Sequence, residues 1–125
     1  MIDSVIQERN KEIMQTYYLI ISRYDIAHVP MKLVLSLLSN SPASRFYMSE
    51  DRAARYIAEY ERGQLSLKGP KLVMFNDFYR VYQRQSERLK GYYKSYIVSY
   101  SLHQQAPSFY LSPYQIKRII FSQQK

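Results

Sequence analysis

The chain has 125 residues, with 18 Lys+Arg against 10 Asp+Glu and a formal net charge of +8. It contains no cysteine, which excludes disulfides and thiolate-metal sites. No apolar run approaches the roughly 20 residues that a membrane-spanning helix needs, and the first residues lack the regions of a signal peptide. We therefore expect a cytoplasmic protein with no membrane segment, whose charge favours a polyanionic partner.

The first half of the chain predicts three helices. Apolar residues at helical spacing predict a first helix that ends near Tyr24. Pro30 suits the first position of a second helix, which ends before Pro42 because the residue preceding a proline is pushed out of the α region. Ser49 is the expected N-cap of a third helix, and Gly63 its left-handed C′ residue.

The second half predicts three more helices, which follow a glycine-containing linker at 64–70. Aromatic residues at helical spacing predict a fourth helix that extends to about Leu89. Segment 92–102 fits both a strand and a helix, and we expect a helix because the equivalent segment of the first half has a clearer helical pattern. Ser112 is the expected N-cap of a sixth helix, where Gln115 closes a capping box.

Segments 43–57 and 106–120 align without a gap, so the chain contains an internal repeat. The identical positions are Ala43/Ala106, Phe46/Phe109, Tyr47/Tyr110, Ser49/Ser112, Arg55/Arg118 and Ile57/Ile120. Each half alone would be marginally stable. The predicted fold is therefore all-α, with two tandem three-helix units, 1–63 and 71–125, that arose by duplication, are joined by the linker 64–70 and share one compact core.

The excess positive charge lies in the second copy. Residues 1–62 carry 8 Lys+Arg and 8 Asp+Glu, whereas residues 63–125 carry 10 and 2. This asymmetry predicts that the second copy presents a basic face to its partner.

The fourth predicted helix carries the strongest candidate site. Arg80, Arg84 and Arg88 recur at i, i+4 and i+8, so they form one stripe, which Lys90 and Lys94 continue. Arginine presents a planar fork of donors that matches phosphate oxygens. The alternative is a solvated, salt-bridged face.

The sixth predicted helix carries Gln115, Lys117 and Arg118 without an acid. In a helix-turn-helix protein this helix would address base edges. Segment 41–49 argues against that fold. It would be the turn between the second and third helices and has nine residues, whereas the usual turn has about three to four. The predicted nucleic-acid-binding residues are Arg80, Arg84, Arg88, Lys90, Lys94, Gln115, Lys117 and Arg118.

The aromatic residues have two expected roles. We expect Phe46 and Phe109 to fill the core, and Tyr47 and Tyr110 to point elsewhere, because alternate residues of an extended segment face opposite sides. The tyrosines at the start of the fifth segment are expected in the core or between the copies, and stacking on single-stranded bases is the alternative. They are Tyr92, Tyr93, Tyr96 and Tyr100.

Signals for catalysis are few. The second half contains only Asp77 and Glu87 as acids, and His28 and His103 lack neighbours at the spacing of a metal site or a nucleophile. No glycine-rich phosphate loop is present. We therefore predict a protein that is not an enzyme and that uses no cofactor or metal.

The run SPASRFYMSEDRAARYI resembles a pattern, roughly P-A-P-R-F-Y-V-S-x-E-x-A, of small uncharacterised proteins from gut anaerobes and their phages or mobile elements. Ser44 replaces the second proline of the pattern and Asp51 its glutamate. The second copy keeps Pro107 but has Tyr114 at the acidic position. The resemblance implies a genomic setting and transfers no site residue.

The leading hypothesis is a non-enzymatic nucleic-acid-binding protein of a phage or mobile element, with DNA favoured over RNA and the second copy supplying the basic face. The alternative is a small structural or adaptor protein, such as a phage assembly component or a host-factor inhibitor. In that case the chain would bind protein or form a homo-oligomer through its first copy.

Overall fold

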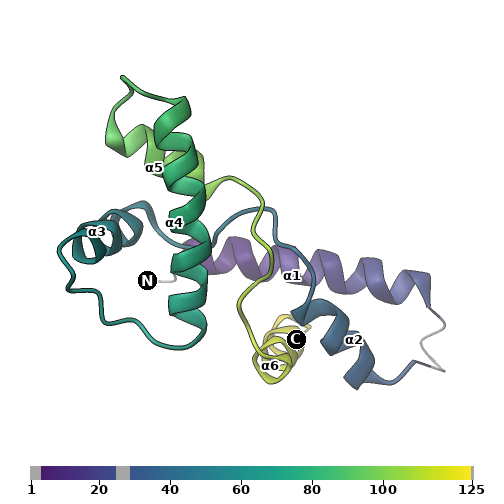
Figure 1. Cartoon of the computed structure of the whole chain (residues 1–125). Coiled ribbons are helices and arrows are strands. Elements are labelled where there is room, and N and C mark those ends of the chain that lie inside the picture. Colours follow the sequence, from purple (N-terminus) through teal and green to yellow (C-terminus); the bar gives the residue numbers. More distant parts are fainter. Residues whose placement is uncertain (1–3, 25–28, 125) are drawn as a thin grey trace. The chain divides into compact units, whose positions relative to one another are not determined.

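The computed structural model describes residues 4–24 and 29–124, and within these ranges it is all-helical (Figure 1). The helices are α1 (Ser4–Arg23), α2 (Met31–Ser39), α3 (Glu50–Glu61), α4 (Pro70–Arg88), α5 (Lys94–Leu102) and α6 (Pro113–Gln123). The predicted all-α class is confirmed. The ambiguous segment 92–102 contains α5, so its helical interpretation is confirmed as well. None of these helices has the length and apolarity that crossing a membrane would require.

The repeated motif begins a helix in both copies, as predicted. The Ser49 hydroxyl accepts a hydrogen bond from the Arg52 amide at 3.2 Å, and the Ser112 hydroxyl accepts one from the Gln115 amide at 3.2 Å. The Gln115 side-chain oxygen accepts from the Ser112 amide at 2.9 Å, which completes the predicted capping box. Gly63 follows α3 with φ of 71°, the left-handed conformation expected there.

The chain forms two compact units that exchange their third helices. Unit 1 comprises Met1–Ala43 and Pro107–Lys125, and unit 2 comprises Ser44–Ala106. In unit 1, α6 packs against α1 and α2; in unit 2, α3 packs against α4 and α5. The units therefore differ from the predicted tandem units 1–63 and 71–125.

Two segments carry out this exchange: Ser44–Ser49 and Pro107–Ser112, which we call the exchange segments. In the first, the Phe46 amide donates to the Leu102 carbonyl at 2.9 Å, which ties the segment to the end of α5. Phe46 and Phe109 are 1% and 4% exposed, so their predicted place in the core is confirmed. Each ring lies in the unit that contains the first two helices of the other copy. Sequence order alone assigned each third helix to the wrong partners.

The exchange segments are held by different side chains. Arg45 is buried, and its guanidinium donates to the carbonyls of Phe46 at 3.2 Å and Met48 at 3.3 Å. At the equivalent place in the second segment, the Ser108 hydroxyl accepts from the Tyr110 amide at 3.0 Å. Tyr110 has φ of 59°, a conformation in which non-glycine residues are uncommon.

Buried positions recur in the two copies, in agreement with a duplication. In α2 the buried residues Val34, Leu35 and Leu38 correspond to the buried residues Ile97, Val98 and Ser101 of α5. The buried pair of α3, Ala53 and Ile57, corresponds to the buried pair of α6, Ile116 and Ile120. The two copies therefore present the same helix faces to a core, although each core combines helices from both copies.

Candidate nucleic-acid interface

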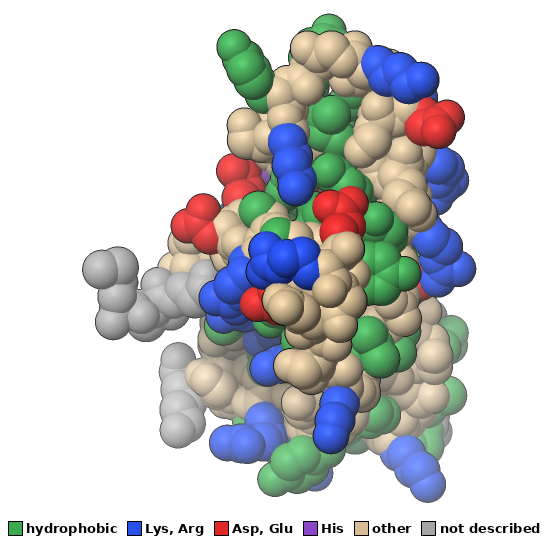
Figure 2. All heavy atoms as spheres, turned by 60° about the vertical axis from the view of Figure 1, so that its left-hand side comes forward, with side chains coloured by type: hydrophobic (Ala, Val, Ile, Leu, Met, Phe, Trp, Pro, Cys, Tyr) green, Lys and Arg blue, Asp and Glu red, His purple; other side chains and the backbone are tan. Residues whose placement is uncertain are grey.

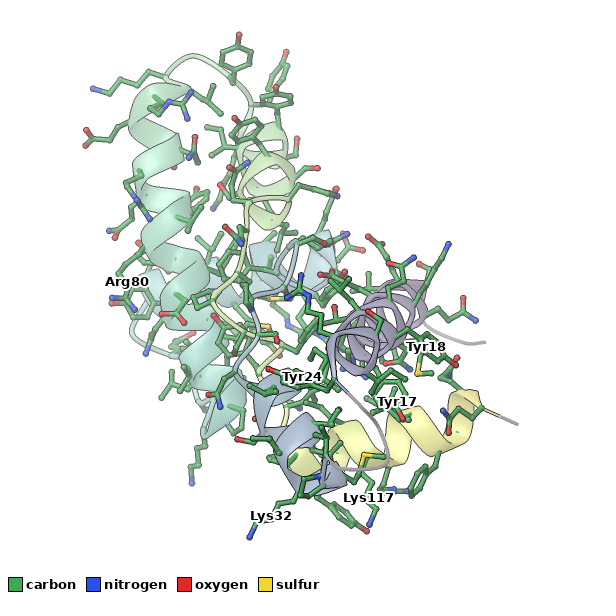
Figure 3. All side chains as sticks on the ribbon, turned by 90° about the vertical axis from the view of Figure 1, so that its right-hand side faces the viewer. Tyr17, Tyr18, Tyr24, Lys32, Arg80 and Lys117 are labelled. Carbon is green, nitrogen blue, oxygen red and sulfur yellow. The ribbon has the colours of Figure 1, made fainter. Side chains whose placement is uncertain are left out.

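The arginines of α4 lie outside the buried face of the helix. Phe75, Phe78 and Gln85 are the buried residues of α4. Successive residues of a helix turn by about 100°, which places Arg80 and Arg84 on the other side and Arg88 at the edge of the buried side, next to Gln85; all three arginines are exposed. Figure 3 shows Arg80 projecting away from α4. We call these three residues the arginine stripe.

The members of the arginine stripe differ in their partners. Arg80 forms an ion pair with Asp77, one turn earlier on α4. The Arg88 guanidinium donates to the Gln85 side-chain oxygen at 2.9 Å. Arg84 has no hydrogen-bond or ion-pair partner among the described residues. Because an exposed ion pair contributes only about 0–1 kcal/mol, the contact of Arg80 with Asp77 leaves its guanidinium available for exchange with a phosphate.

Lys90 and Lys94 extend the positive charge beyond the end of α4. Both side chains are exposed, Lys90 in the connection to α5 and Lys94 at the first position of α5. The sequence contains no Asp or Glu after Glu87. This end of the α4–α5 pair is therefore basic without a compensating acid on the chain that follows.

The remaining predicted residues lie in the other unit. Gln115, Lys117 and Arg118 are exposed on α6, which belongs to unit 1. The Gln115 side-chain oxygen is already engaged in the capping box. The Lys117 ammonium lies 5.6 Å from the centroid of the Phe121 ring, and Figure 3 shows Lys117 pointing outward from α6. The fold therefore gathers the residues of α4 and its extension on unit 2, but places the three residues of α6 on unit 1.

The exchange of helices also redistributes the charge. Unit 1 carries 7 Lys+Arg and 4 Asp+Glu, and unit 2 carries 11 and 6. The corresponding net charges are +3 and +5, so neither unit is neutral. The prediction of a neutral copy and a basic copy holds along the sequence but does not describe the two units, because acidic α3 packs with α4 and basic α6 packs with α1.

The tyrosines near the start of α5 are exposed, contrary to the expected place in the core. Tyr92, Tyr93 and Tyr96 are 59%, 86% and 48% exposed. The physical reason is that α5 buries Ile97, Val98, Ser101 and Leu102, and these residues occupy the opposite side of the helix. Tyr92, Tyr96 and Tyr100 are spaced four residues apart. This spacing is the sequence signal that could have predicted that they lie together on a side of the helix other than the buried one. Figure 2 shows exposed hydrophobic side chains among the Lys and Arg side chains of the visible face.

Unit 1 contains a small apolar pocket between the end of α1 and the start of α2. Its volume is about 240 Å³, and its lining consists of Tyr17, Ile21, Tyr24, Val29, Met31 and Val34. Figure 3 shows Tyr17 and Tyr24 on the side of α1 that faces α2. Small-molecule sites usually measure about 300–1,000 Å³ and contain several converging polar groups. This pocket is smaller, and only its tyrosine hydroxyls are polar among the side chains that line it.

The histidines form no recognisable site in the described part of the chain. His28 lies outside the described residues. The His103 Nδ1 lies 2.8 Å from the Ser99 carbonyl and its Nε2 lies 3.4 Å from the Arg45 guanidinium, so its ring packs beside the first exchange segment. Over the described residues, no group of three or more His, Asp or Glu is placed to hold a metal ion.

Comparisons of the chain with protein-family models, with curated proteins and with solved structures found no match.

Proposed function

We propose that the protein binds nucleic acid without catalysing a reaction, and that the arginine stripe of α4 contacts the phosphate backbone. The observation that carries this proposal is the exposure of Arg80, Arg84 and Arg88 on one side of a single helix. Three guanidinium groups at intervals of four residues span about 12 Å of helix. They present a row of bidentate donors to successive phosphate groups.

The basic surroundings of the stripe support a polyanion as the partner. Lys90 and Lys94 follow the stripe, and no acid occurs between Glu87 and the end of the chain. DNA is the first choice among polyanions, and the resemblance of the repeated motif suggests a phage or mobile element as the setting.

The salt dependence of binding tests the proposal. Each phosphate that a protein neutralises on duplex DNA contributes roughly −0.9 to the slope of log affinity against log salt. The triple change of Arg80, Arg84 and Arg88 to Gln should therefore flatten this slope by about 2 to 3 units. The affinity of a labelled duplex is measured by fluorescence anisotropy over a range of salt concentrations.

A matched control exists on α3, which packs against α4 in the same unit. Arg52 and Arg55 on this helix and Arg62 at its C-cap are exposed, and the helix also carries Glu50, Asp51, Glu59 and Glu61. Changing these three arginines to Gln removes the same charge from a surface that acids already compensate. An equal flattening from both triples would mean that net charge governs binding, and the absence of salt-sensitive binding by the unaltered chain would refute the proposal.

The exposed apolar side chains of unit 1 favour a second candidate, a structural or adaptor protein that binds another protein. Tyr18, Leu19, Tyr114 and Phe121 are 51%, 52%, 68% and 51% exposed. Light scattering coupled to size-exclusion chromatography distinguishes the two candidates. A stable oligomer that ignores heparin favours protein binding, whereas a species that elutes from heparin only at raised salt favours nucleic acid.

A further inference from the structure

The tyrosines at the start of α5 form a stacked column on the surface of unit 2. The rings of Tyr92 and Tyr96 have centroids 5.1 Å apart and planes 23° apart, and those of Tyr96 and Tyr100 are 6.3 Å and 26° apart. Residues four apart lie above one another on a helix, so Tyr96 and Tyr100 follow the axis of α5, and Tyr92, which precedes the helix, extends the column at its N-terminal end. Tyr93 lies beside the column and is 86% exposed. We call Tyr92, Tyr93, Tyr96 and Tyr100 the tyrosine ladder.

The ladder is not part of the core of unit 2. The buried side of α5 consists of Ile97, Val98, Ser101 and Leu102, and the core aromatic rings come from other elements. Phe46 packs against Phe78, and Tyr56 packs against Phe75. The ladder therefore leaves aromatic rings in water, and a group of exposed aromatic residues of this kind marks an interaction surface.

The charged residues near the tyrosine ladder indicate which kind of partner it binds. Arg88 is the last residue of α4, Lys94 is the first residue of α5, and Lys90 lies in the connection between them, so all three are within a few residues of Tyr92 and Tyr93. Figure 1 shows this connection at one end of the α4–α5 pair. Glu87 is the last acid of the chain. A protein partner with an apolar face would match the rings but not the positive charge of three cations, beside which Glu87 is the one acid in this stretch of the chain. A partner that combines negative charge with flat π-systems matches both.

We propose that the tyrosine ladder binds single-stranded nucleic acid, with unpaired bases stacked on the rings and the adjoining phosphates neutralised by Arg88, Lys90 and Lys94. Tyr92 ends the column, so a base on its outer face continues the stack, and the ring of Tyr93 offers a second face. In a duplex the bases are already stacked on each other, so the ladder contributes to single-strand binding alone. The inference rests on the proposed function and specifies the form of nucleic acid that the site takes.

The test compares oligothymidylate and oligouridylate with a duplex of mixed sequence in fluorescence anisotropy. Stacking on an aromatic side chain is worth about 1–3 kcal/mol per base, which corresponds to about 5- to 150-fold in affinity. The triple change of Tyr92, Tyr93 and Tyr96 to Ala should weaken single-strand binding by at least about 5-fold and leave duplex affinity within about twofold. The corresponding triple change to Phe keeps the rings and should retain single-strand binding.

Unit 1 provides the matched control, because Tyr18, Tyr24 and Tyr114 are 51%, 47% and 68% exposed there. Their change to Ala should leave single-strand binding unchanged. If the triple variant does not fold, the single change Tyr93→Ala provides the test. The Tyr93 ring is almost fully exposed, so its removal should leave the fold intact and still weaken single-strand binding.

Two outcomes overturn the ladder proposal and leave the proposed function standing. The first is a ladder triple that binds both single strands as the unaltered chain does, while the salt-sensitive duplex binding persists. The second is a Phe triple that loses as much affinity as the Ala triple, which would assign binding to the hydroxyls instead of the rings. Failure of the unaltered chain to bind any of the three probes would instead refute the proposed function, and the ladder proposal with it.

Discussion

The ring of Phe46 packs edge-on against that of Phe78, with centroids 5.8 Å apart and planes 71° apart, although the two residues come from different copies of the repeat. The chain leaves α2, enters unit 2 through Phe46 and returns to unit 1 through the second exchange segment. Phe109 is buried at the equivalent place in unit 1. Each copy therefore completes the core of the other, so neither copy contains a whole core.

This exchange predicts which fragments of the chain fold. Residues 44–106 are contiguous and contain all three helices of unit 2. We expect the excised fragment to be helical and to unfold cooperatively, although a chain of this length is marginal because it buries only about 60% of its surface. Circular dichroism during thermal unfolding provides the measurement.

Fragment 1–63 is the matched control, since it has the same length and contains one whole copy of the repeat. It includes α3, whose partners α4 and α5 would be missing. We expect it to show little cooperative unfolding. A fragment 1–63 that unfolds cooperatively while fragment 44–106 does not would contradict the exchange.

Replacement of the two exchanged phenylalanines tests the same packing within the full chain. Phe46→Ala and Phe109→Ala each remove a buried ring, and such changes cost about 3–5 kcal/mol of unfolding free energy. Urea unfolding of the full chain should show both losses. In fragment 44–106 the change Phe46→Ala should abolish cooperative unfolding, and a fragment that tolerates it would show that the Phe46 ring does not hold unit 2 together.

Loss of either helix cap should lower the stability of the protein by a similar, modest amount. Ser49 and Ser112 each accept a hydrogen bond from the amide three residues later, so Ser49→Ala and Ser112→Ala should each lower the unfolding free energy by about 1 kcal/mol. Ser66→Ala, in the exposed connection between α3 and α4, serves as the control and should change it by less than about 0.5 kcal/mol. Unchanged urea midpoints for both cap variants would contradict the assignment.

Local features of the fold could be predicted from the sequence, and the pairing of the helices could not. Ser49, Ser112 and Gly63 identify helix ends because a cap is satisfied by neighbours in the chain. The exchange depends on contacts such as that between Phe46 and Phe78, which lie far apart in sequence. The copies are similar enough that α3 and α6 present the same buried positions, so the pattern of apolar residues gives no preference between the two pairings.

The candidate site could likewise be predicted only in part from the sequence. The arginine stripe follows from helical spacing alone, and the structure places all three arginines on the exposed side of α4. The grouping with Gln115, Lys117 and Arg118 assumed that α6 packs with α4 and α5, so it depended on the pairing. The exposure of the tyrosine ladder was missed because an aromatic-rich helix usually buries its rings, and here α5 buries its aliphatic side instead.

The Tyr79 hydroxyl donates a hydrogen bond to the Glu61 carboxylate at 3.2 Å across the α3–α4 contact. Burial raises the pKa of Tyr79 above its ordinary value of 10.0, and the hydrogen bond to Glu61 and the charge of that carboxylate raise it further. The folded state therefore holds this proton more tightly than the unfolded state does. The stabilisation is fully present below the pKa of the unfolded chain and is lost as the pH rises through the higher pKa of the folded chain.

We expect the unfolding free energy of the unaltered chain to fall more steeply than that of Tyr79→Phe as the pH rises above about 10. Because the chain has 14 tyrosines, the informative quantity is this difference between variants, measured by urea unfolding at a series of pH values. Glu61→Gln should reduce the difference without removing it, since burial, the largest cause, remains. Tyr93→Phe, on an exposed ring, is the control and should follow the unaltered chain. If the unfolding free energies of the unaltered chain and Tyr79→Phe change in parallel with pH, a role for this hydroxyl in joining α3 to α4 is contradicted. A difference between their slopes that appears only above a pH of about 10 would support that role.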